Sequence, residues 1–310
     1  MTISSAARAP RSTGWTSEPV DPLRDPGRRR AIYTLLETAW PRLPAIIDET
    51  ARLGAKWHEV STPFVHEEDG HPIAHAGVML VPMIIGGEAV EVGCIHAVCT
   101  HPDHRRRGHS RTVMEAALAY CDERVATVML NAVDPAVYER YGFRYLPQSA
   151  FRVTTDDLEV VESRPLRPLS ADHPDDVAAL RRLLRQRTPV SRRLGITEPG
   201  WLFLIDVMLA REHFAPLWIA EDLDLIIAGK VDREQLHVFD VVGPRLPRVA
   251  EIVSRLGEPV ESVLLYFTPD LLEDAAPVEP LLVKTPDSLM VRGSFPIEGT
   301  PFCLPPFARC

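Results

Sequence analysis

A short arginine-rich segment carries the residues of this sequence that are best suited to chemistry. It reads THPDHRRRGHSR over residues 100–111 and lies between a strand-like stretch and an amphipathic helical pattern. The first turn of a helix offers unpaired N–H groups and the positive end of the helix dipole. Gly108 allows the backbone to approach an anion closely, Ser110 is small enough to leave room, and the arginines neutralise charge. The segment therefore predicts a site for a phosphate or pyrophosphate.

A second segment, YERYGF at residues 138–143, follows an apolar strand pattern that ends in MLN. In this order and context, the two segments resemble the GNAT superfamily of N-acetyltransferases. Arg105, Gly108 and Ser110 occupy the positions of the family signature [RQ]-x-x-G-x-[GA], with Ser where Gly or Ala is usual. The second segment resembles the family's Y-x-x-x-G-[FY] stretch.

The resemblance implies acetyl-CoA as co-substrate. In the family, main-chain groups of the strand before the signature bind the pantetheine arm and polarise the thioester carbonyl, while helix N–H groups hold the pyrophosphate. The tyrosine matching Tyr138 often protonates the departing thiolate after direct attack by a neutral amine. The alternative for Tyr138 is a helix residue that packs on the core. The implied coenzyme-binding residues are Val98, Cys99, Thr100, Arg105, Arg106, Arg107, Gly108, His109 and Ser110.

The base that deprotonates the amine stays open among three candidates. Glu91 and His96 lie upstream of the signature, where family members often carry a base, but either also suits a surface or core position. The third candidate is the terminal carboxylate of Cys310. The DPAVYERYGF context resembles the enhanced intracellular survival type of acetyltransferase, which is built from tandem GNAT-like domains and uses its C-terminal carboxylate as base. This chain is shorter and has no room for that group's sterol-carrier-like domain, and the alternative for Cys310 is a plain chain end.

Histidines are concentrated in one part of the chain, but no metal site is expected. Eight of the eleven histidines fall between His58 and His109, and His101 and His104 lie in the predicted phosphate loop, just before Arg105. Their spacing lacks a carboxylate or cysteine partner at a helical offset, so phosphate or solvent contact is the better interpretation.

Hydrophobic periodicity predicts an α/β (α+β) fold with two GNAT-like domains, each a mixed, mostly antiparallel sheet flanked by helices. Two helices are expected over residues 30–54, then strands joined by turns at Asp69-Gly70 and Gly86-Gly87, then the helix after the signature. The last strand pairs of the two halves are expected within FRYLPQSAFRV and between LLVKT and SLMVRG. The predicted segments are a flexible arm (1–29), an acetyl-CoA-binding domain (30–161), a linker (162–176) and a degenerate GNAT-like domain (177–310).

The second half repeats the order of elements without the signature. At the corresponding junction, DVVGPRLPRVAEIV, Gly243 and Arg245 are present, but Pro247 has no N–H to give to a phosphate. We therefore expect this half to share a core with the first and to wall the acceptor pocket, helped by Asp222, Asp224 and Asp240.

Composition favours an ordinary soluble protein. The 310 residues are 45% apolar, carry a net charge of −9, and include no apolar run of membrane-spanning length. Five cysteines without a CxxC pair argue against a disulfide framework and favour the cytoplasm. The negative charge disfavours nucleic acid, and we expect neither a nucleic-acid nor a membrane partner, whereas oligomerisation is left open.

The leading hypothesis is an N-acetyltransferase acting on a primary amine of a small cationic acceptor, of which an aminoglycoside-like molecule is one example. The alternatives are a protein-lysine or N-terminal acetyltransferase and a non-catalytic acyl-CoA-binding regulatory module.

Overall fold

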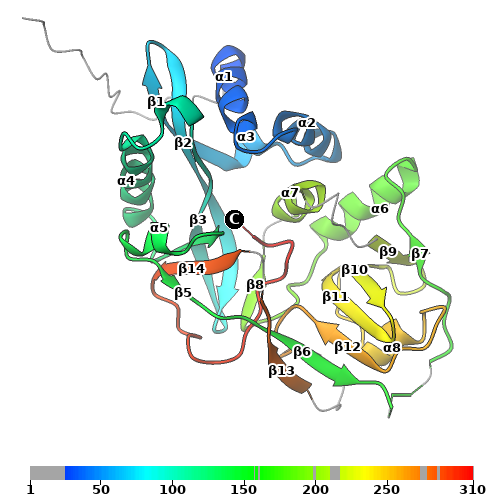
Figure 1. Cartoon of the computed structure of the whole chain (residues 1–310). Helices are drawn as coiled ribbons and strands as arrows, with labels where there is room; N and C mark the ends of the chain where they lie inside the picture. The colour runs from blue at the N-terminus through cyan, green and yellow to red at the C-terminus, as the bar shows by residue number, and fades with distance from the viewer. Residues whose placement is uncertain are drawn as a thin grey trace, which may run out of the picture.

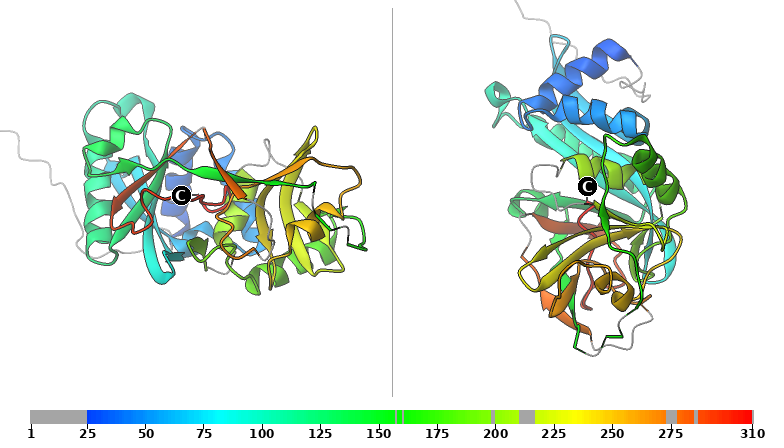
Figure 2. Two further views of the ribbon diagram at one scale, coloured as in Figure 1. Left: turned by 90° about the horizontal axis from the view of Figure 1, so that it is seen from below. Right: turned by 90° about the vertical axis from the view of Figure 1, so that its right-hand side faces the viewer.

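Two seven-stranded sheets lie side by side and make up the two halves of the molecule (Figures 1 and 2). The computed structural model describes residues 25–156, 158–159, 161–197, 200–209, 217–272, 278–284 and 287–309. The mixed α/β class expected from the sequence, with two sheets flanked by helices, is confirmed.

The first sheet begins with a three-stranded antiparallel meander, and a fourth strand then runs parallel to the third. Its order is β1-β2-β3-β4-β14-β5, with β8 added at the end of β2. Both expected hairpin turns are present, with positive φ at Asp69-Gly70 and Gly86-Gly87. The strands are β1 (Ser61–Glu68), β2 (His71–Ile85), β3 (Glu88–Thr100), β4 (Thr127–Ala132), β5 (Arg144–Tyr145), β8 (Leu194–Ile196) and β14 (Ser288–Gly293).

The second sheet repeats this arrangement with different strands. β9, β10 and β11 are antiparallel neighbours, and β12 runs parallel to β11, as β4 does to β3. The full order is β13-β6-β12-β11-β10-β9-β7. The strands are β6 (Ser149–Thr154), β7 (Arg167–Pro168), β9 (Leu217–Ala220), β10 (Leu225–Asp232), β11 (Gln235–Val242), β12 (Ser262–Leu265) and β13 (Val278–Leu282).

The two halves exchange one strand each. β6, from the first half of the chain, pairs antiparallel with β12 of the second sheet, and β14, from the end of the chain, pairs antiparallel with β4 of the first. The strand pairs expected at the end of each half are therefore wrong, because β5 and β6 lie in different sheets, as do β13 and β14. Apolar side chains drive the exchange, since Leu289, Met290 and Val291 of β14 are fully buried beside β4.

Helices cover the outer faces and fill the space between the sheets. α4 (His109–Asp122) buries Val113, Met114 and Ala117 against the outer face of the first sheet. α1 (Pro26–Glu37), α2 (Leu43–Leu53), α6 (Pro174–Arg185) and α7 (Trp201–Leu209) share one core with both sheets. α8 (Val249–Val253) packs on the far side of the second sheet. Two short helices, α3 (Trp57–Val60) and α5 (Ala136–Glu139), complete the set.

The C-terminal segment, residues 302–309, runs into the shared core between the two halves (Figure 1). Phe302, Leu304 and Phe307 are buried there, and Phe307 meets Phe203 of α7 with ring centroids 5.5 Å apart. The segment ends with the Arg309 N–H donating to Asp206 at 2.8 Å. The apolar tail is thus part of the core up to Arg309.

Some stretches expected to be irregular are regular. Residues 26–29, assigned to a flexible arm, form the start of α1, because Asp25 caps the Gly27 N–H and Pro26 occupies the first turn. Residues 1–24 lie outside the described residues. Within the expected linker, Arg167–Pro168 pairs with β9 as β7, and α6 begins at Pro174.

One cysteine departs from expectation, since Cys94 is disulfide-bonded, while Cys99, Cys121 and Cys303 are free and buried. Across the described ranges, no helix combines the length and apolar character that a membrane span requires.

Candidate functional site

The first feature of the candidate site is the edge of β3 that faces β4. The two parallel strands pair only from Val92 to Cys94 on β3, so β3 continues to Thr100 without a paired β4 residue. A bulge lies in this stretch, where the β2–β3 register shifts and Ala97 takes a φ of 50°. On this edge the main-chain groups of Val98 and Thr100 have no β4 partner, whereas Cys99 pairs with His75 of β2. This edge is suited to an extended ligand.

The second feature is the junction between β3 and α4. After a single 3₁₀ turn (Pro102–His104), the chain reaches α4 through Gly108, which caps the helix with a φ of 90°. No side chain caps this helix, and the N–H groups of residues 107–110 donate no hydrogen bond within the described part of the chain. A Cβ added at Gly108 would meet nothing within 4 Å. The junction is therefore an open cradle of N–H donors at the positive end of a 14-residue helix.

The side chains around the cradle differ in their exposure to solvent. Arg105, Arg106 and Arg107 are exposed, and the Arg105 Nε donates to the Thr100 carbonyl oxygen at 3.3 Å, which ties the loop to the end of β3. Cys99 is buried, and this burial raises the pKa of its thiol to about 12, so it stays protonated at neutral pH. The Thr100 hydroxyl is buried without a partner among the described residues.

Tyr138 is half-buried on α5, where it packs in the same apolar cluster as Val98 and α4. Its ring meets Phe143 edge-on with centroids 6.3 Å apart. Burial, with a smaller contribution from Tyr141, raises the pKa of the phenol above its usual 10.0. The phenol is thus fully protonated at neutral pH, as a general acid must be before it reacts.

The candidate bases lie in three different settings. Glu91 is exposed on the fully paired part of β3, opposite Pro82. His96 is buried against Trp57, its Nε2 lies 2.9 Å from the Ser61 hydroxyl, and burial lowers its pKa to about 3. A Cβ at Gly77 would lie 2.4 Å from that Nε2, so the strand pair is built around the imidazole. Cys310 lies outside the described residues.

The corresponding junction in the second half is closed. Between β11 and α8, the carboxylate of Glu251 accepts the Arg248 N–H at 2.8 Å and two guanidinium N–H groups of Arg245 at 2.9 and 3.1 Å. α8 has only five residues. The helix start is therefore satisfied by its own side chain, in agreement with the missing signature.

The acidic residues expected to wall an acceptor pocket are ion-paired instead. Asp222 pairs with Arg255, Asp224 with Arg182 and Asp240 with Arg187, at 2.6, 2.5 and 2.7 Å. Asp240 and Arg187 are both buried. The three carboxylates therefore hold the second half together and supply no unpaired negative charge to an acceptor.

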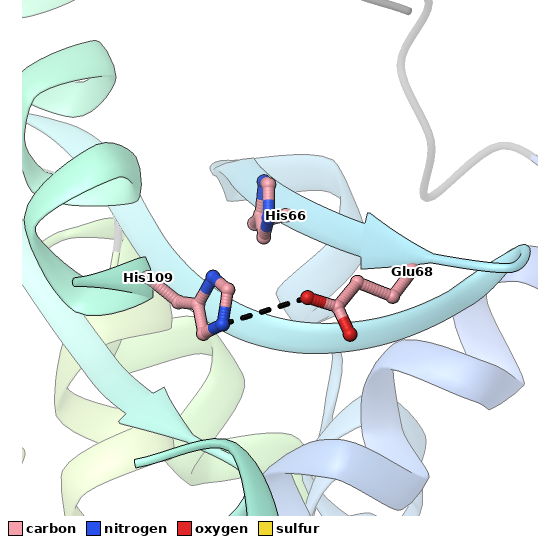
Figure 3. Close-up of side chains that lie close together, drawn as sticks. All are labelled: His66, Glu68 and His109. Carbon is pink, nitrogen blue, oxygen red and sulfur yellow. Dashed lines mark ion pairs between the residues drawn. The ribbon is translucent and has the colours of Figure 1, made fainter. Parts of the chain in front are cut away.

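Sequence reasoning missed a cluster of His66, Glu68 and His109, whose ligand atoms lie within 4.8 Å of one another (Figure 3). His66 and Glu68 are two residues apart on β1, and His109 is the first residue of α4. The alternation of a strand places residues two apart on one face, so the His-x-Glu spacing was the available signal. Burial is the main cause that lowers the pKa of the His109 imidazole, and the neighbouring His66 is the second.

Comparison with known proteins agrees with this architecture. Residues 27–146 match the family profile of the acetyltransferase (GNAT) domain. Across 86% of the chain, the fold resembles a protein from Enterococcus faecalis V583 described as a probable N-acyltransferase (TM-score 0.54, 17% identity, 70% of that chain covered). It also resembles Eis1 from Mycobacterium abscessus (TM-score 0.51, 17% identity, 86% and 70% covered). No curated protein matches the sequence significantly.

The fold is thus GNAT-like, and the stretch that matches the family profile includes the β3–α4 junction. The chain carries a GNAT acetyltransferase domain over residues 27–146, which confirms the resemblance that the signature suggested.

Proposed function

We propose that this chain transfers an acetyl group from acetyl-CoA to a primary amine of a small cationic acceptor. The observation that carries the proposal is the coincidence of two open sets of backbone groups, the unpaired edge of β3 and the uncapped start of α4, joined by residues 101–108. An extended amide chain ending in a pyrophosphate fits that order of donors and acceptors. In this proposal, acetyl-CoA supplies the activated acyl group as a thioester.

Different groups of the protein bind different parts of acetyl-CoA in this proposal. Main-chain groups of Val98 to Thr100 align the pantetheine arm, and an N–H there polarises the thioester carbonyl. The N–H groups of Arg107 to Ser110 hold the pyrophosphate, and the exposed guanidinium groups of Arg105, Arg106 and Arg107 neutralise its charge. The exposed arginines and the open space at Gly108 support this assignment.

Protons must move at two places. As the amine nitrogen bonds to the carbonyl carbon, the carbon–sulfur bond breaks, and we assign to Tyr138 the proton that the departing thiolate receives. The attacking amine must lose a proton to a base. Of the three candidates, His96 is the least suited, because it is buried against Trp57 and this burial lowers its pKa to about 3.

Glu91 is solvated but lies several residues before the open edge of β3, at about 3.3 Å per residue. Cys310 remains a candidate because residues 302–309, which lead to it, are buried in the core between the sheets. Amidating the C-terminal carboxylate and replacing Glu91 with Gln separate these two assignments, since only loss of the base lowers kcat and shifts the acidic limb of the pH profile.

The proposed acceptor rests on the net charge of the chain and on the packing of the second half against the first sheet. The net charge of −9 favours a cation, and α7, the C-terminal segment and the second sheet share one core with the first sheet. A protein-lysine or N-terminal acetyltransferase is the second candidate. A non-catalytic acyl-CoA-binding module is the third, favoured by Ser110 at a signature position that usually holds Gly or Ala.

The test is release of free thiol from acetyl-CoA with a panel of aminoglycosides, polyamines and lysine peptides. We expect turnover with a small polycation and at least about 100-fold less with Tyr138→Phe. Turnover with peptides alone would favour the second candidate. Calorimetric binding of acetyl-CoA without thiol release above the Tyr138→Phe background for any amine would favour the third.

A further inference from the structure

The cluster of His66, Glu68 and His109 is built from two elements that pack rigidly against each other. On β1, Phe64, His66 and Glu68 share the strand face turned toward α4. Phe64 meets Tyr120 of α4 with ring centroids 5.5 Å apart, which fixes the strand against the helix below the cluster. The cluster thus lies on a strand and on the first turn of a long helix, where side-chain positions are well defined.

One nitrogen of the cluster and one of the neighbouring His104 have no hydrogen-bond partner among the described residues. His109 Nε2 lies 3.6 Å from Glu68 Oε1, and His104 Nδ1 lies 3.3 Å from Glu68 Oε2. Both nitrogens are buried and have no hydrogen-bond partner within the described residues. Buried imidazole nitrogens without partners are costly, so their convergence on one carboxylate requires an explanation.

The separations suit a metal ion better than direct hydrogen bonds. A tetrahedral Zn²⁺ with nitrogen and oxygen ligands at about 2.0–2.1 Å holds neighbouring ligand atoms roughly 3.3 Å apart. The Glu68–His109 distance of 3.6 Å lies near that value, whereas an N–H···O bond would be shorter. The rings of His66 and His109 stack with centroids 4.8 Å apart, and one ligand atom from each lies within 4.8 Å of a Glu68 carboxylate oxygen (Figure 3).

We propose that His66, Glu68 and His109 bind a divalent transition metal ion, with Zn²⁺ as the best match. Two imidazoles and one carboxylate are ligands that Zn²⁺ accepts, and three protein ligands leave a fourth position for water. His104 faces the second oxygen of Glu68 and acts as the positioning residue for that carboxylate. The ion ties the end of β1 to the first residue of α4, immediately beside Gly108. It therefore acts as a clamp on the junction and takes no part in the acetyl transfer proposed above.

The direct test is a calorimetric titration of the metal-stripped full chain with Zn²⁺ alone. We expect one ion per chain, and replacement with Co²⁺ should give the visible absorption of a tetrahedral site. Glu68→Gln and His66→Ala should each weaken Zn²⁺ binding by more than about 100-fold, and His104→Gln by about 10- to 100-fold.

The matched control is His71→Gln, since His71 lies on the same hairpin, is exposed, and has its Nδ1 3.0 Å from the Asp69 carbonyl oxygen. The affinity of the His71→Gln variant for Zn²⁺ should equal that of the unmodified chain. Glu68 is partly exposed and Gln has the same shape, so this variant should keep its fold, as circular dichroism will verify. Absence of stoichiometric Zn²⁺ binding, or unchanged affinity in Glu68→Gln, overturns the proposal and leaves a purely protein-based ion-pair cluster. Because no acetyl-CoA is present, the result is independent of the proposed acetyl transfer.

Discussion

The two sheets have the same order of strands, but their strand-to-helix junctions differ in every property that matters for binding an anion. At β3–α4, Gly108 adopts a φ of 90°, the helix is uncapped, and it continues for 14 residues. At β11–α8, Glu251 occupies the helix start and the helix has five residues. In the proposed function, the repeated fold carries a ligand site only where the backbone donors are left open.

The same contrast holds for the strands that precede the junctions. In the first sheet, β3 continues past its last pair with β4 through the small residue Ala97. In the second sheet, Phe239 follows the last pair of β11 with β12, and its ring lies 5.0 Å from that of Tyr266 and 6.2 Å from that of Phe307. Aromatic side chains, one of them from the C-terminal segment, thus pack together beside this part of β11.

The strongest test of this contrast is Gly108→Asp. The substitution places a carboxylate beside the N–H groups, where it repels the phosphate and competes for N–H contacts worth about 1.5–3 kcal/mol each, so we expect no detectable acetyl-CoA binding by calorimetry. The control is Gly87→Asp, because Gly87 has the same φ of 90° and the same open space in a distant hairpin turn. Equal loss in both variants would point to backbone strain and count against the cradle.

Tyr138→Phe tests whether the chemistry is confined to the first half. Loss of a general acid should lower kcat by about 1,000-fold, with little change in the KM for acetyl-CoA. Because the pKa of Tyr138 is raised, the unmodified enzyme should keep a protonated acid, and its activity, beyond pH 10.0 as far as this group is concerned. Tyr266→Phe is the control, since Tyr266 follows β12 as Tyr138 follows β4, and its hydroxyl lies 3.0 Å from His237 Nδ1. A comparable fall in kcat there would remove the special role of Tyr138.

The sequence predicted those features that local periodicity and turn chemistry determine. The hairpins at Asp69-Gly70 and Gly86-Gly87, the helix after Gly108 and the closed junction near Pro247 were all visible as short patterns. The glycine signature also suggested the GNAT resemblance, which the family profile confirms over residues 27–146. Each of these depends on residues that are neighbours in the chain.

The features that were missed depend on residues far apart in the chain. The exchange of β6 and β14 cannot be inferred from alternation, because either strand pattern suits either sheet edge. The pairing of Asp222, Asp224 and Asp240 with arginines likewise requires the fold. The three histidine-cluster residues are separated by up to 43 positions, from His66 to His109, and meet only because β1 packs on α4.

Arg187→Met tests the view that the second half is a structural unit. Removing the guanidinium leaves the carboxylate of Asp240 buried and unpaired, which should lower the free energy of unfolding by about 3 kcal/mol. Burial raises the pKa of Asp240 above 3.8, so the folded state binds its proton more readily than the unfolded state. The deficit should therefore be largest at neutral pH and shrink as pH falls through the folded-state pKa.

The control for Arg187→Met is Arg182→Met, which breaks the solvent-exposed pair with Asp224. We expect a loss of at most about 1 kcal/mol in urea denaturation, because solvent screens that pair. Similar losses for both variants would show that burial of Asp240 does not set the cost.

The smallest effect is expected where the closed junction is opened deliberately. Glu251→Gln removes the carboxylate charge at the start of α8 and should lower the free energy of unfolding by about 0.5–1 kcal/mol. It should not create a coenzyme site, since α8 has five residues and Pro247 lacks an N–H. The decisive measurement is acetyl-CoA calorimetry on the double variant Gly108→Asp/Glu251→Gln, which should stay as inert as Gly108→Asp alone. If the double variant bound acetyl-CoA, the Glu251 cap alone would be what prevents binding at the second junction. Helix length and Pro247 would then contribute little to that loss of binding.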